Sequence, residues 1–211
     1  MIPSTKKTKR GFFAMCCAVA LLIGLLSGAE PLSVGEEGAD DTKTSAGSAA
    51  ETARTVVVQE TNGTTVVLDA KKASTNAYKG MHLVAGNDVT VQEISDLTML
   101  FDMDKYMYAE ESTHFWLSEA SGSQEKSKTV IYLDEGATLN RIVNPLENGA
   151  VYQVDTPNST MAVRGTVFRV EVREGKDGKI YTYLAVLNGA VKVGLKTTEG
   201  KYNGVSETIP A

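Results

Sequence analysis

The stretch that decides the fold is VRGTVFRVEVREGKDGKIYTYLAVLNGAVKV, residues 163–193. In its first part Phe168, Val170 and Val172 alternate with charged residues, which is the period of two expected of a strand with one buried face. Lys-Asp-Gly at 176–178 indicates a turn into a second strand, 180–187, and Asn-Gly at 188–189 a turn into a third, 190–193. These residues therefore predict a three-stranded meander.

The residues upstream have the same β-prone character. Two runs, 55–59 and 64–68, flank Asn62-Gly63 and predict a hairpin, and 129–133 predicts another strand. Only residues 90–100 are compatible with a short amphipathic helix. We expect an all-β domain over residues 55–195, built of short strands as a roll or a solenoid-like stack, with a β-sandwich as the alternative. Residues 196–211 are expected to form a C-terminal tail.

The N-terminus has the features of an export signal. Four basic residues between 6 and 10 precede an apolar run over 12–26, and the small residues Ser27 and Ala29 follow it. Residues 1–29 are predicted to be a hydrophobic helix, either a signal peptide cleaved after Ala29 or an uncleaved anchor. Because the positive charge precedes the apolar run, both alternatives place the rest of the chain outside the cytoplasm, secreted or anchored to the cell membrane.

Residues 30–54 are small, polar and acidic, and predict a disordered linker. From Glu30 onward, 17 basic residues stand against 26 acidic ones, a net charge of −9. Such a balance argues against binding to nucleic acid or to an anionic membrane surface. Membrane contact is expected only through the N-terminal segment.

Residues 154–170, VDTPNSTMAVRGTVFRV, resemble the signature of the FecR domain family, in which Val-x-Thr-Pro is followed by Val-Arg-Gly-Thr-x-Phe. Residues 80–89 resemble the family's upstream Gly-x-x-Leu-x-x-Gly-Asp-x-Val element, residues 139–146 its linking strand, and residues 186–193 its closing hairpin. The resemblance covers residues 60–195 and implies a bacterial, extracytoplasmic FecR-like β domain.

The family is named for a regulator of iron-dicitrate transport that passes a signal from an outer-membrane receptor to a sigma factor. Only eleven residues precede the apolar run of this chain. We therefore expect the domain in a stand-alone form, and a sigma-factor pathway does not follow from the resemblance.

The motif itself has a structural interpretation. Pro157 lacks a backbone donor and ends a ladder, and Gly165 can adopt a backbone conformation closed to other residues. The planar guanidinium of Arg164 could reach carbonyl groups that such a corner leaves unpaired. We expect the motif residues to form a fold-specifying corner; they are Thr156, Pro157, Arg164, Gly165, Thr166 and Phe168.

Aromatic residues suggest a binding face. If Ile180, Leu184 and Val186 face the core, then Tyr181 and Tyr183 share the exposed face of the strand and offer a surface for a partner or a glycan. Residues 115–117, Phe-Trp-Leu, are a second place where aromatic side chains could line such a face.

No catalytic, cofactor-binding or metal-binding residues are predicted. His82 and His114 lack the spacing of metal ligands, and Asp102-Met103-Asp104 fits a turn better than a calcium loop. We expect a non-enzymatic module of the cell envelope that binds a protein or glycan or senses a signal. A structural surface protein, acting as spacer or assembly unit, is the alternative. A carbohydrate-active enzyme would require two carboxylates facing each other about 5–10 Å apart.

Overall fold

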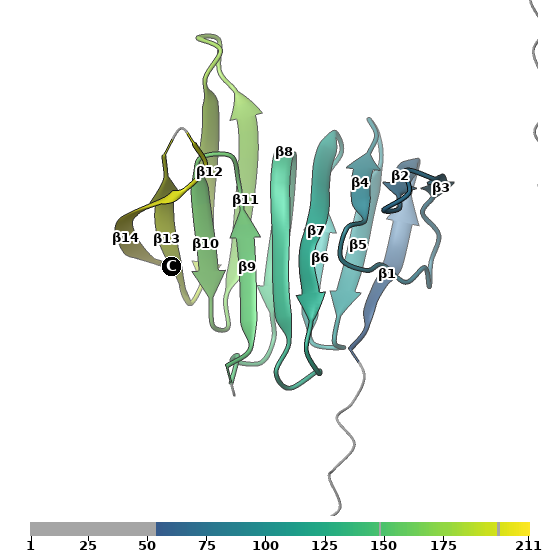
Figure 1. The fold of residues 1–211 in the computed structure, drawn as a ribbon, viewed down its shortest axis with the longest axis horizontal. Coiled ribbons are helices and arrows are strands. Elements are labelled where there is room, and N and C mark those ends of the chain that lie inside the picture. The colour runs from purple at the N-terminus through teal and green to yellow at the C-terminus, as the bar shows by residue number, and fades with distance from the viewer. Residues whose placement is uncertain (1–53, 148, 198) are drawn as a thin grey trace, which may run out of the picture. The chain divides into compact units, whose positions relative to one another are not determined.

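The structure is a computed structural model that describes residues 54–147, 149–197 and 199–211. All regular secondary structure in these residues is β (Figure 1), so the prediction of an all-β domain is confirmed. The helix predicted for residues 1–29 lies outside the described residues, and so do residues 30–53 of the linker predicted for 30–54. Within the described residues no helix could cross a lipid bilayer.

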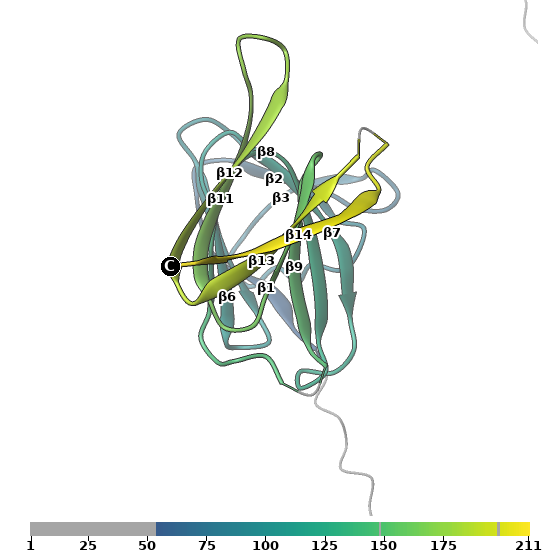
Figure 2. The ribbon, with the colours of Figure 1, turned by 90° about the vertical axis from the view of Figure 1, so that its left-hand side faces the viewer.

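The strands form two facing layers, here called sheet A and sheet B (Figure 2). Sheet A runs in the order β1 (Val56–Asn62), β5 (Asp96–Phe101), β6 (Lys105–Ala109), β8 (Lys128–Ile142), β11 (Val167–Glu174) and β12 (Ile180–Asn188). Sheet B runs in the order β3 (Ser74–Asn76), β2 (Thr65–Leu68), β4 (Asp88–Val91), β7 (Thr113–Ser121), β8, β9 (Val151–Asp155), β10 (Ser159–Val163), β13 (Ala190–Lys196) and β14 (Tyr202–Pro210).

Strand β8 belongs to both sheets. Its first half pairs with β7 and β9 in sheet B, and its second half pairs with β6 and β11 in sheet A. The change occurs at Gly136, whose φ is 87°, and a Cβ there would lie 2.5 Å from Cα of Thr113. A glycine at this position therefore lets the strand bend against β7.

The pairing differs from a solenoid-like stack. Every described strand pair is antiparallel except β8 with β9, whereas stacked coils would pair in parallel. The two facing sheets are the arrangement of the sandwich alternative, modified by the strand that they share.

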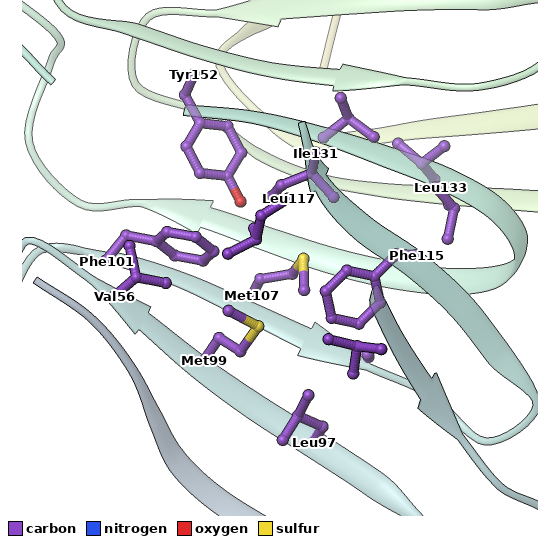
Figure 3. Close-up of a cluster of buried hydrophobic side chains, with 14 of the residues drawn as sticks. Val56, Leu97, Met99, Phe101, Met107, Phe115, Leu117, Ile131, Leu133 and Tyr152 are labelled. Atoms are coloured by element: carbon purple, nitrogen blue, oxygen red, sulfur yellow. The ribbon is translucent and has the colours of Figure 1, made fainter. Parts of the chain in front are cut away.

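The core lies between the sheets and follows from the alternation along each strand (Figure 3). Leu97, Met99 and Phe101 of β5 point into it from sheet A, and Phe115 and Leu117 of β7 from sheet B; all five are fully buried. The helix considered for residues 90–100 is therefore wrong. These residues end β4 and begin β5, because their alternate apolar side chains fill the space between two sheets.

Both Asn-Gly pairs act differently from the prediction. β1 pairs with β5 and β2 pairs with β3 and β4, so Asn62-Gly63 leads the chain from sheet A to sheet B and joins no hairpin. β13 pairs with β10 and β14 and not with β12, so Asn188-Gly189 is likewise a corner between the sheets. The predicted hairpin at 55–68 and the last turn of the meander are wrong, whereas the hairpin β11–β12 around 176–178 is confirmed.

Two ends of the predicted domain extend further in the structure. The predicted C-terminal tail contains β14, which pairs along β13. At the other end, the side chain of Arg54 is 7% exposed and lies 3.3 Å from the carboxylate of Asp102, to which Lys105 is also bound. Asp102 lies in the turn between β5 and β6, so the turn predicted for 102–104 is confirmed.

Candidate functional site

The first part of the motif is a tight turn between β9 and β10. The amide of Thr156 donates to the carbonyl of Ser159 over 2.9 Å, with Pro157 and Asn158 at the tip. Thr156 is fully buried, and its hydroxyl lies 2.8 Å from that of Ser159. Proline suits the tip because it has no amide hydrogen to leave unpaired there.

Side-chain hydrogen bonds connect this turn of sheet B to strand β12 of sheet A. The hydroxyl of Thr182 on β12 donates to Asn158 Oδ1 over 2.6 Å, and Asn158 Nδ2 donates to the carbonyl of Ile180 over 3.0 Å. From β13, Lys196 Nζ donates to the carbonyl of Thr156 over 3.0 Å and lies 3.4 Å from the carboxylate of Asp155. The turn in sheet B thus fixes the position of β12 in sheet A.

The second part of the motif is a corner at the other end of β10. Gly165 has φ of 127°, and a Cβ there would lie 3.1 Å from Cα of Pro145. Thr166 is 1% exposed, and its hydroxyl donates to the carbonyl of Ala190 over 3.0 Å. Phe168 then enters the core. The corner moves the chain from β10 in sheet B to β11 in sheet A.

The structure therefore separates the six motif residues into a hairpin turn and a corner, with β10 between them. Arg164 differs from the expectation, because it is exposed and its guanidinium forms no hydrogen bond with any described residue. Its backbone carbonyl accepts from the amide of Leu146 over 3.2 Å.

The tyrosine pair lies on the hairpin β11–β12, which extends beyond the neighbouring strands (Figures 1 and 2). Tyr181 and Tyr183 are 40% and 45% exposed, and their ring centroids are 6.5 Å apart. The guanidinium of Arg173 lies 4.3 Å from the centroid of Tyr183, a cation–π distance. The hydroxyl of Tyr181 donates to Asp177 over 2.9 Å, and this hydrogen bond raises the pKa of Tyr181.

A hollow of about 370 Å³ separates this hairpin from the Pro157 turn. Its lining comes from both sheets and mixes apolar with charged side chains: Tyr132, Asp134, Glu135, Pro157, Val172, Arg173, Glu174 and Ile180. The hairpin, the turn and this hollow together form the candidate site, which we call the tyrosine rim.

A row of aromatic side chains on the outer face of sheet B meets the tyrosine rim at Tyr132. The rings of Trp116 and Tyr132 are stacked 4.2 Å apart at 11°, and Lys196 Nζ lies 5.3 Å from the centroid of Tyr132. Of residues 115–117, only Trp116 faces outward, because its neighbours are buried. Sequence reasoning missed Tyr132, although the alternation of Ile131 and Leu133 on either side of it would have placed it outward.

His114 continues this row and bridges two carboxylates. Its Nε2 lies 2.9 Å from Asp88 and its Nδ1 lies 3.2 Å from Asp134. Burial lowers the pKa of His114, but the hydrogen bonds and charges of both aspartates outweigh burial and raise the pKa above 6.5. Among the described residues no three His, Cys, Asp or Glu side chains gather as metal ligands would.

The arrangement defines a class of protein: an all-β domain whose signature residues shape a hairpin turn within sheet B and a corner between the two sheets. The family model described as FecR protein matches residues 87–192, and the chain belongs to this family. The comparison with curated proteins gave no match.

One solved structure is similar, a protein from Parabacteroides distasonis provisionally assigned as an anti-sigma factor. It is 14% identical with a TM-score of 0.43, and the match covers 58% of this chain and 50% of that one. The chain thus spans half the length of that protein.

Proposed function

We propose that the chain is an exported regulator of signal transduction that binds a partner in the cell envelope through the tyrosine rim and catalyses no reaction. Membership of the FecR family supports the regulatory role. The basic and apolar N-terminal residues support export, either with cleavage after Ala29 or with retention as an anchor.

The observation that carries the proposal is the exposed tyrosine pair on a hairpin whose position is fixed. Aromatic side chains are enriched where proteins bind one another, and a rigid support lowers the entropy that binding costs. Asn158 of the motif turn in sheet B is hydrogen-bonded to Ile180 and Thr182 of β12 in sheet A. A partner that contacts Tyr181 and Tyr183 on β12 would therefore be connected to both sheets. The adjoining aromatic row gives the partner, protein or glycan, further surface.

The test is made in the producing cell. Replacing Tyr181 and Tyr183 together by serine should reproduce the change in transcription caused by deleting the gene. The matched control replaces Tyr78 and Tyr108, which are also exposed but lie elsewhere, and should behave as wild type. If deletion leaves transcription unchanged, the chain is a structural surface protein. If deletion acts but the tyrosine variant does not, the regulatory role stands and the tyrosine rim is not its site.

Export is tested separately by the intact mass of the protein recovered from outside the cytoplasm. A chain that begins at Glu30 supports cleavage, and a full-length chain in the membrane fraction supports the anchor. Recovery from the cytoplasm alone would contradict export.

A further inference from the structure

The two ends of the sandwich differ in whether a segment of the chain covers the edge strand. At the end formed by β1, an extended segment runs along the open edge of the strand. Val58 N donates to Met81 O over 2.8 Å, Gly80 N to Val58 O over 2.8 Å, and Leu83 N to Val56 O over 2.9 Å. Leu83 is 3% exposed and joins the core. This end is therefore closed by backbone pairing together with one inserted apolar side chain.

The opposite end, between β12 and β14, has no such segment among the described residues. β12 pairs only with β11, and β14 only with β13. Between them lies a hollow of about 320 Å³, here called the end cleft. Its lining is apolar except for one hydroxyl and one carboxylate, and consists of Leu184, Val193, Leu195, Val205, Ser206, Glu207 and Ile209.

The edge of β12 can accept another strand. Asn158 Nδ2 binds the carbonyl of Ile180 on the side away from β11, so the alternating ladder directs the backbone groups of Thr182, Leu184 and Val186 to the same open side. The nine residues of β12 include no charge, proline or glycine. Edges usually carry such residues to prevent pairing with other chains.

The other exposed edges are protected. β3 has only three residues, and β14 contains Gly204, Glu207 and Pro210. β12 is thus the edge at which pairing is neither blocked nor already satisfied within the described chain.

We propose that the end cleft binds an extended segment of a partner protein, which adds to β12 as a strand and inserts alternate apolar side chains beside Leu184 and Val205. The partner segment carries a basic residue, because Glu207 forms no ion pair with any described residue and lies in an otherwise apolar lining. This site does not depend on the proposed signalling role.

Charge and side-chain size decide against two other occupants. Residues 30–53 of this chain contain six acidic residues and one lysine, with Leu32 and Val34 as their largest apolar side chains, and would bring mainly like charge to Glu207. A second copy would offer its own β12, which has no basic residue. A partner with alternating aliphatic residues and one lysine or arginine fits both the lining and the carboxylate.

The probe is a fluorescent seven-residue peptide, TVTKTVT, in which both valines and the lysine share one face of the strand, and its binding to the full-length chain in mild detergent is measured by anisotropy. Val205→Lys should weaken binding at least about tenfold, since it removes an apolar contact worth about 1.4 kcal/mol. Val205 is 57% exposed, so the variant keeps the fold; the control Ile94→Lys, at a 90% exposed position elsewhere, should bind as wild type.

The role of the Glu207 charge is tested by reversing the charge at position 207 and in the peptide. Glu207→Lys should weaken the binding of TVTKTVT and strengthen that of TVTETVT, and the amide signals of Thr182, Leu184 and Val186 should shift when TVTKTVT binds. Failure of the wild-type chain to bind the peptide would overturn the proposal. Equal weakening of binding by Val205→Lys and by the control Ile94→Lys would also overturn it. So would a stable dimer of the chain alone, because the cleft would then accept a second copy.

Discussion

At the scale of single residues, one buried hydrogen bond joins the sheets through the middle of the core. Tyr152 of β9 is fully buried, and its hydroxyl donates to Asn140 Oδ1 of β8 over 2.8 Å. Asn140 in turn donates to the hydroxyl of Thr138 over 3.1 Å. Burial raises the pKa of Tyr152, so the phenol stays protonated and remains a donor.

Tyr152→Phe should lower the free energy of unfolding by about 1–3 kcal/mol, because it leaves the amide oxygen of Asn140 buried without a donor. Urea denaturation of the variant measures the loss. The control Tyr108→Phe removes the hydroxyl of a residue that is 39% exposed, and should change stability by less than about 0.5 kcal/mol. Equal losses in the free energy of unfolding of the two variants would show that the buried hydrogen bond contributes no more to stability than an exposed hydroxyl group.

His114 predicts how stability depends on pH. Its pKa is raised above 6.5 in the folded state because the protonated ring binds Asp88 and Asp134. The stabilisation is therefore complete below the pKa of the unfolded chain and is lost as pH rises through the higher pKa of the folded chain. The difference in stability between wild type and His114→Gln should be larger at pH 5.5 than at pH 8.5. A difference that stays constant over this range would contradict the prediction.

At the scale of strands, the bend of β8 depends on one glycine. A Cβ at Gly136 would lie 2.4 Å from Thr113 Oγ1 and 2.6 Å from the carbonyl oxygen of Ser112, so Gly136→Ala must displace backbone. Gly178, at the tip of the hairpin β11–β12, also has a positive φ of 72°, but its nearest neighbour would be 3.7 Å away.

We expect Gly136→Ala to cost about 1–3 kcal/mol more than Gly178→Ala, since both variants carry the strain of positive φ but only the first also carries the clash. Thermal and urea denaturation of the two variants give the comparison. Similar losses would indicate that β7 moves aside at little cost and that the bend does not require glycine.

The strands also show what could be predicted from the sequence. The period of two in β11 and the Lys-Asp-Gly turn are local signals, and both were predictable. Asn62-Gly63 and Asn188-Gly189 predicted hairpins, because glycine with positive φ reverses the chain in either setting. Whether such a reversal joins neighbouring strands or leads to the facing sheet depends on which distant strand supplies the pairing, and no local pattern contains that information.

At the scale of the whole domain, the candidate site was partly predictable. The exposure of Tyr181 and Tyr183 followed from alternation alone. The separation of the motif into a hairpin turn and a corner did not follow from the sequence. It depends on the length of β10 and on Pro145 and Ala190, which approach Gly165 and Thr166 from elsewhere in the chain. Arg164 was expected to bind carbonyl groups of the corner, but the carbonyls of Arg164 and Thr166 accept from the backbone amides of Leu146 and Ile142 instead.

Burial across the domain predicts a gradient of local stability. β8 is buried at alternate positions along its length and lies between partners in both sheets, whereas β3 is exposed throughout and β14 at every position except Ile209. Hydrogen exchange should therefore be slowest in β7, β8 and β11 and fastest in β3 and β14, since exposed ends open at lower free energy. Equal protection in all strands would contradict this gradient.

Within β12, the same measurement should show alternation. Amides of Tyr181, Tyr183 and Ala185 bind β11 and should exchange slowly, while those of Thr182, Leu184 and Val186 face the open edge and should exchange quickly. Slow exchange at all six positions in the isolated chain would mean that the edge is already paired. Fast exchange at the even positions alone would show that β12 is ordered and still has a row of backbone groups available to another strand.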